Sequence, residues 1–161
     1  MTIVDSLRGI EGLAESSEQQ YSQNGIHWQH MAASGAMPAA ARAFFDAGYY
    51  LEMLTCLDFT EKEGKFRVVY QFNCPGAQNR HRVYADVAEG QKATSIAHIF
   101  ESANWYEREV YDMFGLIFEN HPNMTRILMP EDSEWHPLRR KFFDPSTMPP
   151  PEAPAKEEAN G

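Results

Sequence analysis

The stretch WYEREVYDMFGLIFENHPNMTRILMPEDSEWHPLRR, residues 105–140, holds most of the unusual chemistry of this chain of 161 residues. The apolar side chains of its first part fall on one side of a helix drawn at about 100° per residue. These side chains are Tyr106, Val110, Met113 and Phe114. Gly115 follows, at the position where helices commonly end on a glycine. The stretch therefore predicts a helix that ends at Gly115 and an irregular arm that begins after it.

The predicted arm covers residues 116–143 and is unusually apolar for an irregular segment. Prolines at positions 122, 130 and 137 bias the residues before them toward extended conformations. The large apolar residues of the arm are Ile117, Phe118, Met124, Ile127, Leu128, Met129, Trp135 and Leu138. An irregular segment buries such residues only if its backbone polar groups also find partners. We therefore expect a second protein surface to cover the arm.

A set of residues at fixed spacing in this stretch resembles a known signature. The set comprises Glu107, Arg108, Glu109, Asp112, Met113, Phe114, His121, Pro122, Arg126, Ile127 and Leu128, extended by MPED at 129–132 and HPLR at 136–139. It is similar to the signature of the C subunit, the 30 kDa-type subunit of NADH-quinone oxidoreductase, respiratory complex I. Roughly forty residues agree closely, which makes the signal more specific than a lone short motif. The chain departs from the family pattern at Thr125, Ser133, Trp135 and Lys141.

The resemblance implies a non-catalytic structural subunit in the hydrophilic arm of a proton-translocating complex. NADH:quinone oxidoreductase activity would belong to the complex, with FMN, iron–sulfur clusters and quinone held by other subunits and no cofactor held by this chain. The implied partners are the quinone-site subunit, of the D type, and the terminal-cluster subunit, of the B type. The implied location is peripheral, on the cytoplasmic side of the cell inner membrane.

Composition excludes several other functions. The formal net charge of -9 and the pI near 5.1 argue against nucleic acid, whose phosphates require a basic surface. No stretch approaches the roughly twenty apolar residues that cross a bilayer, so membrane contact is expected only through partners. Cys56 and Cys74 form no CxxC pair, which argues against iron–sulfur or zinc ligation. The sequence also lacks a glycine-rich phosphate loop and a nucleophile elbow.

Hydrophobic periodicity predicts the elements that precede the signature helix. The predicted strands are 26–31, 51–60, 65–72 and 80–87, with a hairpin turn at 61–64. A helix is expected from the SGAMP string at 34–38 to Gly48, with Pro38 in its first turn. A second, short helix is expected to begin at Thr94 or Ser95 and to lead into the signature helix.

The expected fold is α+β: a mainly antiparallel sheet of three to four strands, helices packed on one face, and an extended irregular C-terminal arm. Residues 1–25 are expected to be a polar N-terminal segment in which Asp5 caps a short helix. Residues 26–115 form the compact domain and 116–143 the partner-docking arm. The Pro- and Glu-rich tail, 144–161, is expected to be disordered.

Three carboxylates, Glu107, Glu109 and Asp112, lie within six residues, a density that suits acid–base catalysis or a metal site. Arg108 precedes Asp112 by four residues, so an intrahelical ion pair between these two is the simpler prediction. We therefore expect the four residues to orient the helix or to contact a partner.

Histidines and arginines complete the candidate site. His121 and His136 each precede a proline, where a neutral imidazole can support a turn or contact a partner. Arginine and aromatic side chains are frequent interface anchors. The expected interface residues are Glu107, Arg108, Glu109, Asp112, His121, Arg126, Trp135, His136, Arg139 and Arg140. Zinc is not expected at His27 and His30, because their segment looks like a strand and no third ligand is near.

Two alternatives remain open at this point. Similar subunits occur in membrane-bound energy-converting hydrogenases and formate-hydrogen lyases, and this sequence does not discriminate between those complexes and complex I. The second alternative is a free-standing enzyme that uses Glu107, Glu109 or Asp112. Such an enzyme would be a soluble, active monomer without a large exposed apolar arm.

Overall fold

A computed structural model describes residues 2–14, 16–19, 25–76 and 79–140. The expectations for the tail, 144–161, for the end of the arm and for Lys141 lie outside these residues. The elements, in order, are α1 (Ile3–Leu7), β1 (Ser17–Glu18), β2 (Trp28–Ala33), a 3-10 turn (Ser34–Ala36), α3 (Met37–Asp46), β3 (Tyr50–Phe59), α4 (Thr60–Glu63), β4 (Lys65–Asn73), β5 (Arg80–Ala88), β6 (Ala93–Thr94), α5 (Glu101–Phe114) and β7 (Phe118–Glu119).

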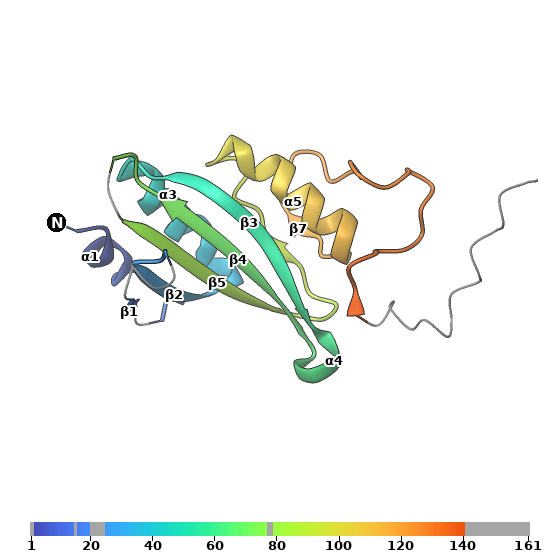
Figure 1. The fold of residues 1–161 in the computed structure, drawn as a ribbon, viewed down its shortest axis with the longest axis horizontal. Helices are drawn as coiled ribbons and strands as arrows, with labels where there is room; N and C mark the ends of the chain where they lie inside the picture. The colour runs from blue at the N-terminus through green and yellow to red at the C-terminus, as the bar shows by residue number, and fades with distance from the viewer. Residues whose placement is uncertain (1, 15, 20–24, 77–78, 141–161) are drawn as a thin grey trace, which may run out of the picture.

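The expected α+β architecture is confirmed, with one more strand than predicted. Five strands form a sheet in the order β1-β2-β5-β4-β3. The pairs β3–β4, β4–β5 and β1–β2 are antiparallel, whereas β2 lies parallel to β5. A separate pair, β6 and β7, is parallel and joins the segment before α5 to the start of the arm. Figure 1 shows α3 behind the sheet, α5 beside β3, and the arm looping past α5.

The core lies on the face of the sheet that the helices cover. Alternate residues of β4 and β5 point into it, among them Phe72 and Val83. Phe44 of α3 stacks on Phe72 with ring centroids 4.3 Å apart, and Val110 and Phe114 of α5 join the same cluster. The predicted apolar side of the signature helix therefore faces the core, although Tyr106 and Met113 are only partly buried there.

One local prediction is wrong, and the predicted hairpin turn is present in a more specific form. No helix begins at Thr94 or Ser95: residues 93–94 form β6, and the next helix starts at Glu101. The segment makes only a single turn, in which the Ser95 hydroxyl oxygen accepts the Ala97 N–H and the Phe100 N–H donates to the Ile96 carbonyl. The Glu107 carboxylate accepts the Ser95 hydroxyl and the Ile96 N–H at the start of this turn. The expected hairpin turn at 61–64 contains a helical turn, α4, closed by Gly64 at φ 64°.

The N-terminal segment contributes to the core. Ile3, Val4 and Leu7 of α1 are buried in the same cluster as the sheet residues, and α1 packs against α3. Thr2, rather than Asp5, is the N-cap, and Asp5 closes a capping box by accepting the Thr2 N–H.

Candidate functional site

Asp112 forms several hydrogen bonds that hold the arm against α5. Its side chain is fully buried near the end of α5. One carboxylate oxygen, Oδ2, accepts the successive N–H groups of Ile127, Leu128 and Met129 at 3.0, 2.7 and 2.9 Å. The other, Oδ1, lies 2.6 Å from Nη1 of Arg126. Successive backbone N–H groups that converge on one anion form a known type of anion-binding concavity, here filled by a side chain of the same protein.

The electrostatics of Asp112 agree with this geometry. Burial alone would raise the pKa of its carboxyl group, but the three N–H donors and the Arg126 guanidinium outweigh burial and hold the pKa below its usual range. Asp112 is therefore an ionised group inside the chain. Its hydrogen bonds fix the course of residues 126–129 against the end of α5.

Arg108 also holds the arm, which corrects the predicted intrahelical pair with Asp112. Its guanidinium donates to the Thr125 carbonyl and hydroxyl at 3.0 and 2.9 Å and to the Arg126 carbonyl at 3.2 Å. It also lies 5.2 Å from the centroid of the Trp105 ring, within the range of a cation–π contact. Arg108 and Asp112 thus act on adjacent parts of the arm instead of on each other.

The second half of the arm returns to the end of α5. Nη2 of Arg126 donates to the Trp135 carbonyl at 3.1 Å, and the Leu138 N–H donates to the Met113 carbonyl at 2.9 Å. Nδ1 of His136 lies 3.0 Å from the Asp112 carbonyl. Because a carbonyl only accepts, His136 carries its proton on Nδ1 in this bond.

Gly115 is required at this point for two reasons. Its φ of 76° lies in the left-handed region, and a Cβ built there would come within 2.7 Å of Cδ2 of His136. The glycine that the sequence assigned to the helix end therefore also lets the arm return against α5.

Glu107 is a second buried carboxylate with a different environment. Its oxygens accept the Ser95 hydroxyl at 2.6 Å and the Ile96 N–H at 2.8 Å. Nε2 of His121 lies 3.9 Å from Oε2 of Glu107 and 3.1 Å from the Asn104 carbonyl. Burial raises the pKa of Glu107 to about 7, more than these two hydrogen bonds lower it. Burial also lowers the pKa of His121. Glu107 therefore titrates near neutrality inside the chain.

The remaining expected interface residues divide into two groups. The Glu109, Trp135 and Arg140 side chains are exposed. Arg139, in contrast, is used within the chain: Nη2 lies 2.6 Å from Oε1 of Glu89, and the guanidinium stands over the ring of Phe66 at 5.3 Å. Arg139 therefore has contacts within its own chain, and its place in a partner interface stays a prediction.

The arm is partly buried and partly exposed. Leu116 and Phe118 are buried in the core. Ile117, Leu128, Trp135 and Leu138 are 43%, 61%, 46% and 54% exposed. The described part of the arm, residues 116–140, thus has a backbone held by hydrogen bonds to α5 and four exposed large apolar side chains.

A buried pair of histidines was missed at the level of sequence. Nε2 of His30 lies 2.9 Å from Nδ1 of His81, and their rings stack. The Ser16 hydroxyl bonds Nδ1 of His30 at 2.7 Å, and Nε2 of His81 bonds Oδ1 of Asn79 at 2.9 Å. Since that amide oxygen only accepts, both histidines are neutral Nε2–H tautomers. The alternation in the strand could have indicated the burial of His81, because His81 lies on the same face as Val83 and Val87.

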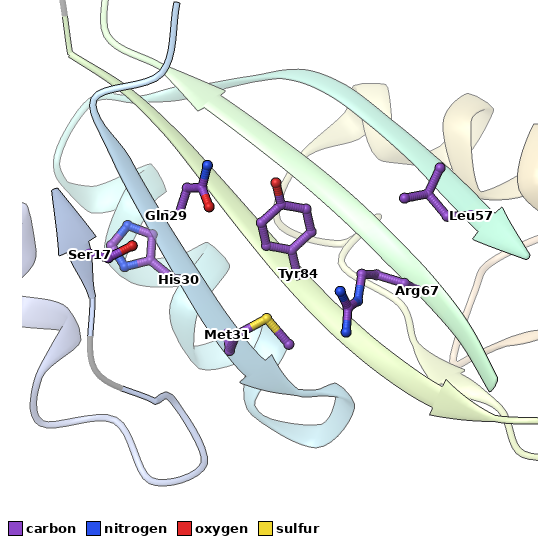
Figure 2. A pocket seen from close by; sticks show the side chains of 7 residues that line it. All are labelled: Ser17, Gln29, His30, Met31, Leu57, Arg67 and Tyr84. Atoms are coloured by element: carbon purple, nitrogen blue, oxygen red, sulfur yellow. The ribbon is translucent and has the colours of Figure 1, made fainter. Parts of the chain in front are cut away.

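The open face of the sheet carries a hollow of about 410 Å³. Figure 2 shows Tyr84, Arg67 and Leu57 on three neighbouring strands, with α3 behind the strand that carries His30. Arg67 is paired with Asp86 at 2.6 Å, so the charges here are satisfied across the strands. None of the expected interface residues lines this hollow, and we do not assign a role to it.

Two further observations concern the described residues alone. No group of three or more His, Cys, Asp or Glu side chains in the described part of the chain is placed to hold a metal ion. No helix among residues 2–140, the undescribed gaps aside, is long and apolar enough to cross a membrane.

The fold is shared with a solved structure of a respiratory assembly. It is the membrane-bound sulfane sulfur reductase, an archaeal respiratory membrane complex, one chain of which superposes with a TM-score of 0.75. The match covers 88% of this chain and 84% of that one at 18% sequence identity, so it shows the fold alone.

Comparison with curated proteins is more specific. The chain is 42% identical over 89 residues to the NADH-quinone oxidoreductase C subunit of Rhodobacter capsulatus, covering 55% of this chain and 45% of the relative. The corresponding C subunit of Roseiflexus castenholzii is 42% identical over 95 residues, 57% of this chain and 53% of the relative. The chain spans about half the length of the curated relatives it matches. Residues 31–147 match the family model described as respiratory-chain NADH dehydrogenase, 30 Kd subunit. The chain belongs to this 30 kDa subunit family of the respiratory-chain NADH dehydrogenase.

Proposed function

We propose that this chain is a non-catalytic structural subunit of the hydrophilic arm of a proton-translocating NADH-quinone oxidoreductase. In this role it joins the quinone-site and terminal-cluster subunits, and FMN, iron–sulfur clusters and quinone reside in other chains. It lies on the cytoplasmic side of the membrane and reaches the membrane only through its partners. Family membership supports the parent complex, and the arm supports the structural role.

The observation that carries the docking role is the combination of a fixed backbone with exposed apolar side chains. The N–H of Leu128 follows that of Ile127 on the same carboxylate oxygen of Asp112, yet the Leu128 side chain is 61% exposed. Exposed apolar patches of this kind mark interaction sites. A surface that is ordered before binding also loses less conformational entropy on association.

The geometry argues against a free-standing enzyme built on the carboxylates. Glu107 and Asp112 have no exposed surface, and their oxygens are occupied by donors of the same chain. A substrate would have to displace these bonds to reach either group. Glu109 is exposed, but a lone surface carboxylate lacks the second group that acid–base catalysis needs.

The test is purification of the intact complex from native membranes, with and without this chain. We expect deletion to abolish assembly, and quinone reductase turnover per assembled complex to be unaffected by substitutions in the arm. A fully assembled, active complex that lacks the chain would refute the proposal. A large fall in turnover per assembled complex on Glu109→Gln would show a catalytic contribution instead.

A second candidate function is the same docking role in a different parent complex. The shared fold with a chain of the membrane-bound sulfane sulfur reductase favours this second candidate, because that chain belongs to a respiratory membrane complex with a different name and reaction. Energy-converting hydrogenases and formate-hydrogen lyases belong to the same group of candidates. Mass spectrometry of the intact native complex distinguishes them, because NADH-oxidising subunits and hydrogenase subunits differ in mass and sequence.

A further inference from the structure

The exposed side chains of the arm between Leu128 and Leu138 are acidic as well as apolar. Between Leu128 and Trp135 the chain reads MPEDSE, and Glu131, Asp132 and Glu134 are all exposed. Three carboxylates thus lie between exposed apolar side chains on one short segment. A partner that covers Leu128 and Trp135 must also remove water from near these carboxylates.

The segment is held at both ends. Met129 at its start donates its N–H to Asp112, and Arg126 bonds the carbonyl of Trp135 at its end. The turn between them is closed by the Ser133 N–H, which donates to the Pro130 carbonyl at 3.1 Å. The acidic and apolar side chains are therefore presented in a defined relative position.

Two arginines of the arm are already engaged. Arg126 pairs with Asp112, and Arg139 pairs with Glu89. Among residues 2–140, leaving aside the undescribed gaps, no Lys, Arg or His lies within ion-pair distance of Glu131, Asp132 or Glu134. Burying an ionised carboxylate without a compensating cation is costly. Since no described residue compensates these three, a partner that covers this segment is expected to supply the positive charge.

We propose that the segment from Leu128 to Leu138 docks on a partner protein that offers an apolar cleft bordered by lysine or arginine side chains. Leu128, Trp135 and Leu138 enter the cleft, and Glu131, Asp132 and Glu134 face the basic border. Complementary charge fixes the register and excludes wrong partners, while the central tryptophan is of the residue type that dominates interface energetics. The inference rests on the proposed function and adds the chemistry of the partner surface to it.

The experiment uses the native complex with a tagged copy of this chain. The test variant carries Glu131→Lys, Asp132→Lys and Glu134→Lys together. The control is Glu61→Lys in α4, a carboxylate that is also exposed and that lies beyond the end of β3. Both isolated chains should melt at the same temperature as the parent, since surface substitutions change stability little. We expect the test variant to enter the complex at least tenfold less than the control.

A second measurement reports on the same contacts without mutation. A carbodiimide that joins carboxylates directly to amines, applied to the intact complex, should link Glu131, Asp132 or Glu134 to lysines of another subunit. Incorporation of the triple variant at the control level, or carboxylates that remain freely modified by a soluble amine in the assembled complex, would overturn the inference while the proposed function stands. Failure of the unmodified chain to purify with any respiratory complex would instead overturn the proposed function.

Discussion

The carboxylate of Asp112, at the end of a helix, accepts the backbone N–H of Leu128 at 2.7 Å, across sixteen positions of chain. This bond and its two neighbours, from Ile127 and Met129, place the arm before any partner binds. The same carboxylate neutralises Arg126. A helix residue thus determines the course of a segment that has little regular structure of its own.

Replacing Asp112 should release the arm. In Asp112→Ala the guanidinium of Arg126 and three N–H groups lose their acceptor, and removing one partner of a buried ion pair costs about 3 kcal/mol. Hydrogen exchange at Ile127, Leu128 and Met129 should become fast, and the urea midpoint should fall. Glu109→Ala, exposed on the same helix, should change neither. Unchanged exchange in Asp112→Ala would mean that the arm is held by other contacts.

Arg139 should contribute to the stability of the isolated chain. Its partly exposed pair with Glu89 and its contact with Phe66 together suggest a loss of about 1 kcal/mol in Arg139→Ala. Arg139→Met, which retains the apolar stem, should recover part of the loss. Chemical denaturation of the three chains is the measurement. Equal stability of Arg139→Ala and the parent would show that these contacts do not stabilise the isolated chain.

Leu128 should act in assembly and not in folding. Its side chain is 61% exposed, so Leu128→Ala should leave the melting temperature of the isolated chain unchanged. If Leu128 is a central interface residue, incorporation into the complex should weaken by about 2 kcal/mol, or some thirtyfold. Leu57→Ala, on the open face of the sheet and also exposed, is the matched control. Parallel loss of assembly in both variants would argue against an interface at the arm.

Glu107 should make stability fall as the pH rises toward neutrality. Its pKa is raised by burial from 4.5 to about 7, so the stabilisation from its bound proton is fully present below about pH 4.5 and is lost as the pH rises through about 7. Glu107→Gln, which cannot ionise, should lose this dependence. The measurement is the difference in unfolding free energy between parent and variant from pH 4 to 8. A difference that changes in the opposite direction would contradict the buried, proton-binding Glu107.

The pair of His30 and His81 should make the stability of the chain fall as the pH is lowered. Burial lowers the pKa of His30 to about 4 and of His81 to about 3, from a usual 6.5. The unfolded chain therefore binds protons first, and the stabilisation present above pH 6.5 is lost as the pH falls toward 4. In a Glu107→Gln background, adding His81→Gln should reduce this slope, and the lowered pKa values of His121 and Asp112 leave a remainder of the same sign. A slope that is insensitive to His81→Gln would show that the acid sensitivity arises elsewhere.

Much of the fold was predictable because its signals are local. The alternation in 80–87 and the β-forming residues of 51–60 and 65–72 indicated β5, β3 and β4 within one or two residues of their observed bounds. The apolar spacing before Gly115 indicated α5. The parallel pairing of β2 with β5 was not predictable in this way, because it joins segments about fifty residues apart and depends on how the chain crosses the sheet.

The same distinction between local and long-range signals holds for the candidate site. The amino-acid sequence by itself determined the fold class, the family and the composition of the arm, since periodicity, helix-ending glycine and motif spacing are written in neighbouring residues. Only the tertiary structure decided what each charged residue does. Arg108 lies within helical reach of Asp112 in sequence, yet it bonds Thr125, while Asp112 bonds Arg126. A buried carboxylate takes the donors that satisfy it most fully in a low-dielectric interior, and those donors come from a segment that only folding brings to it.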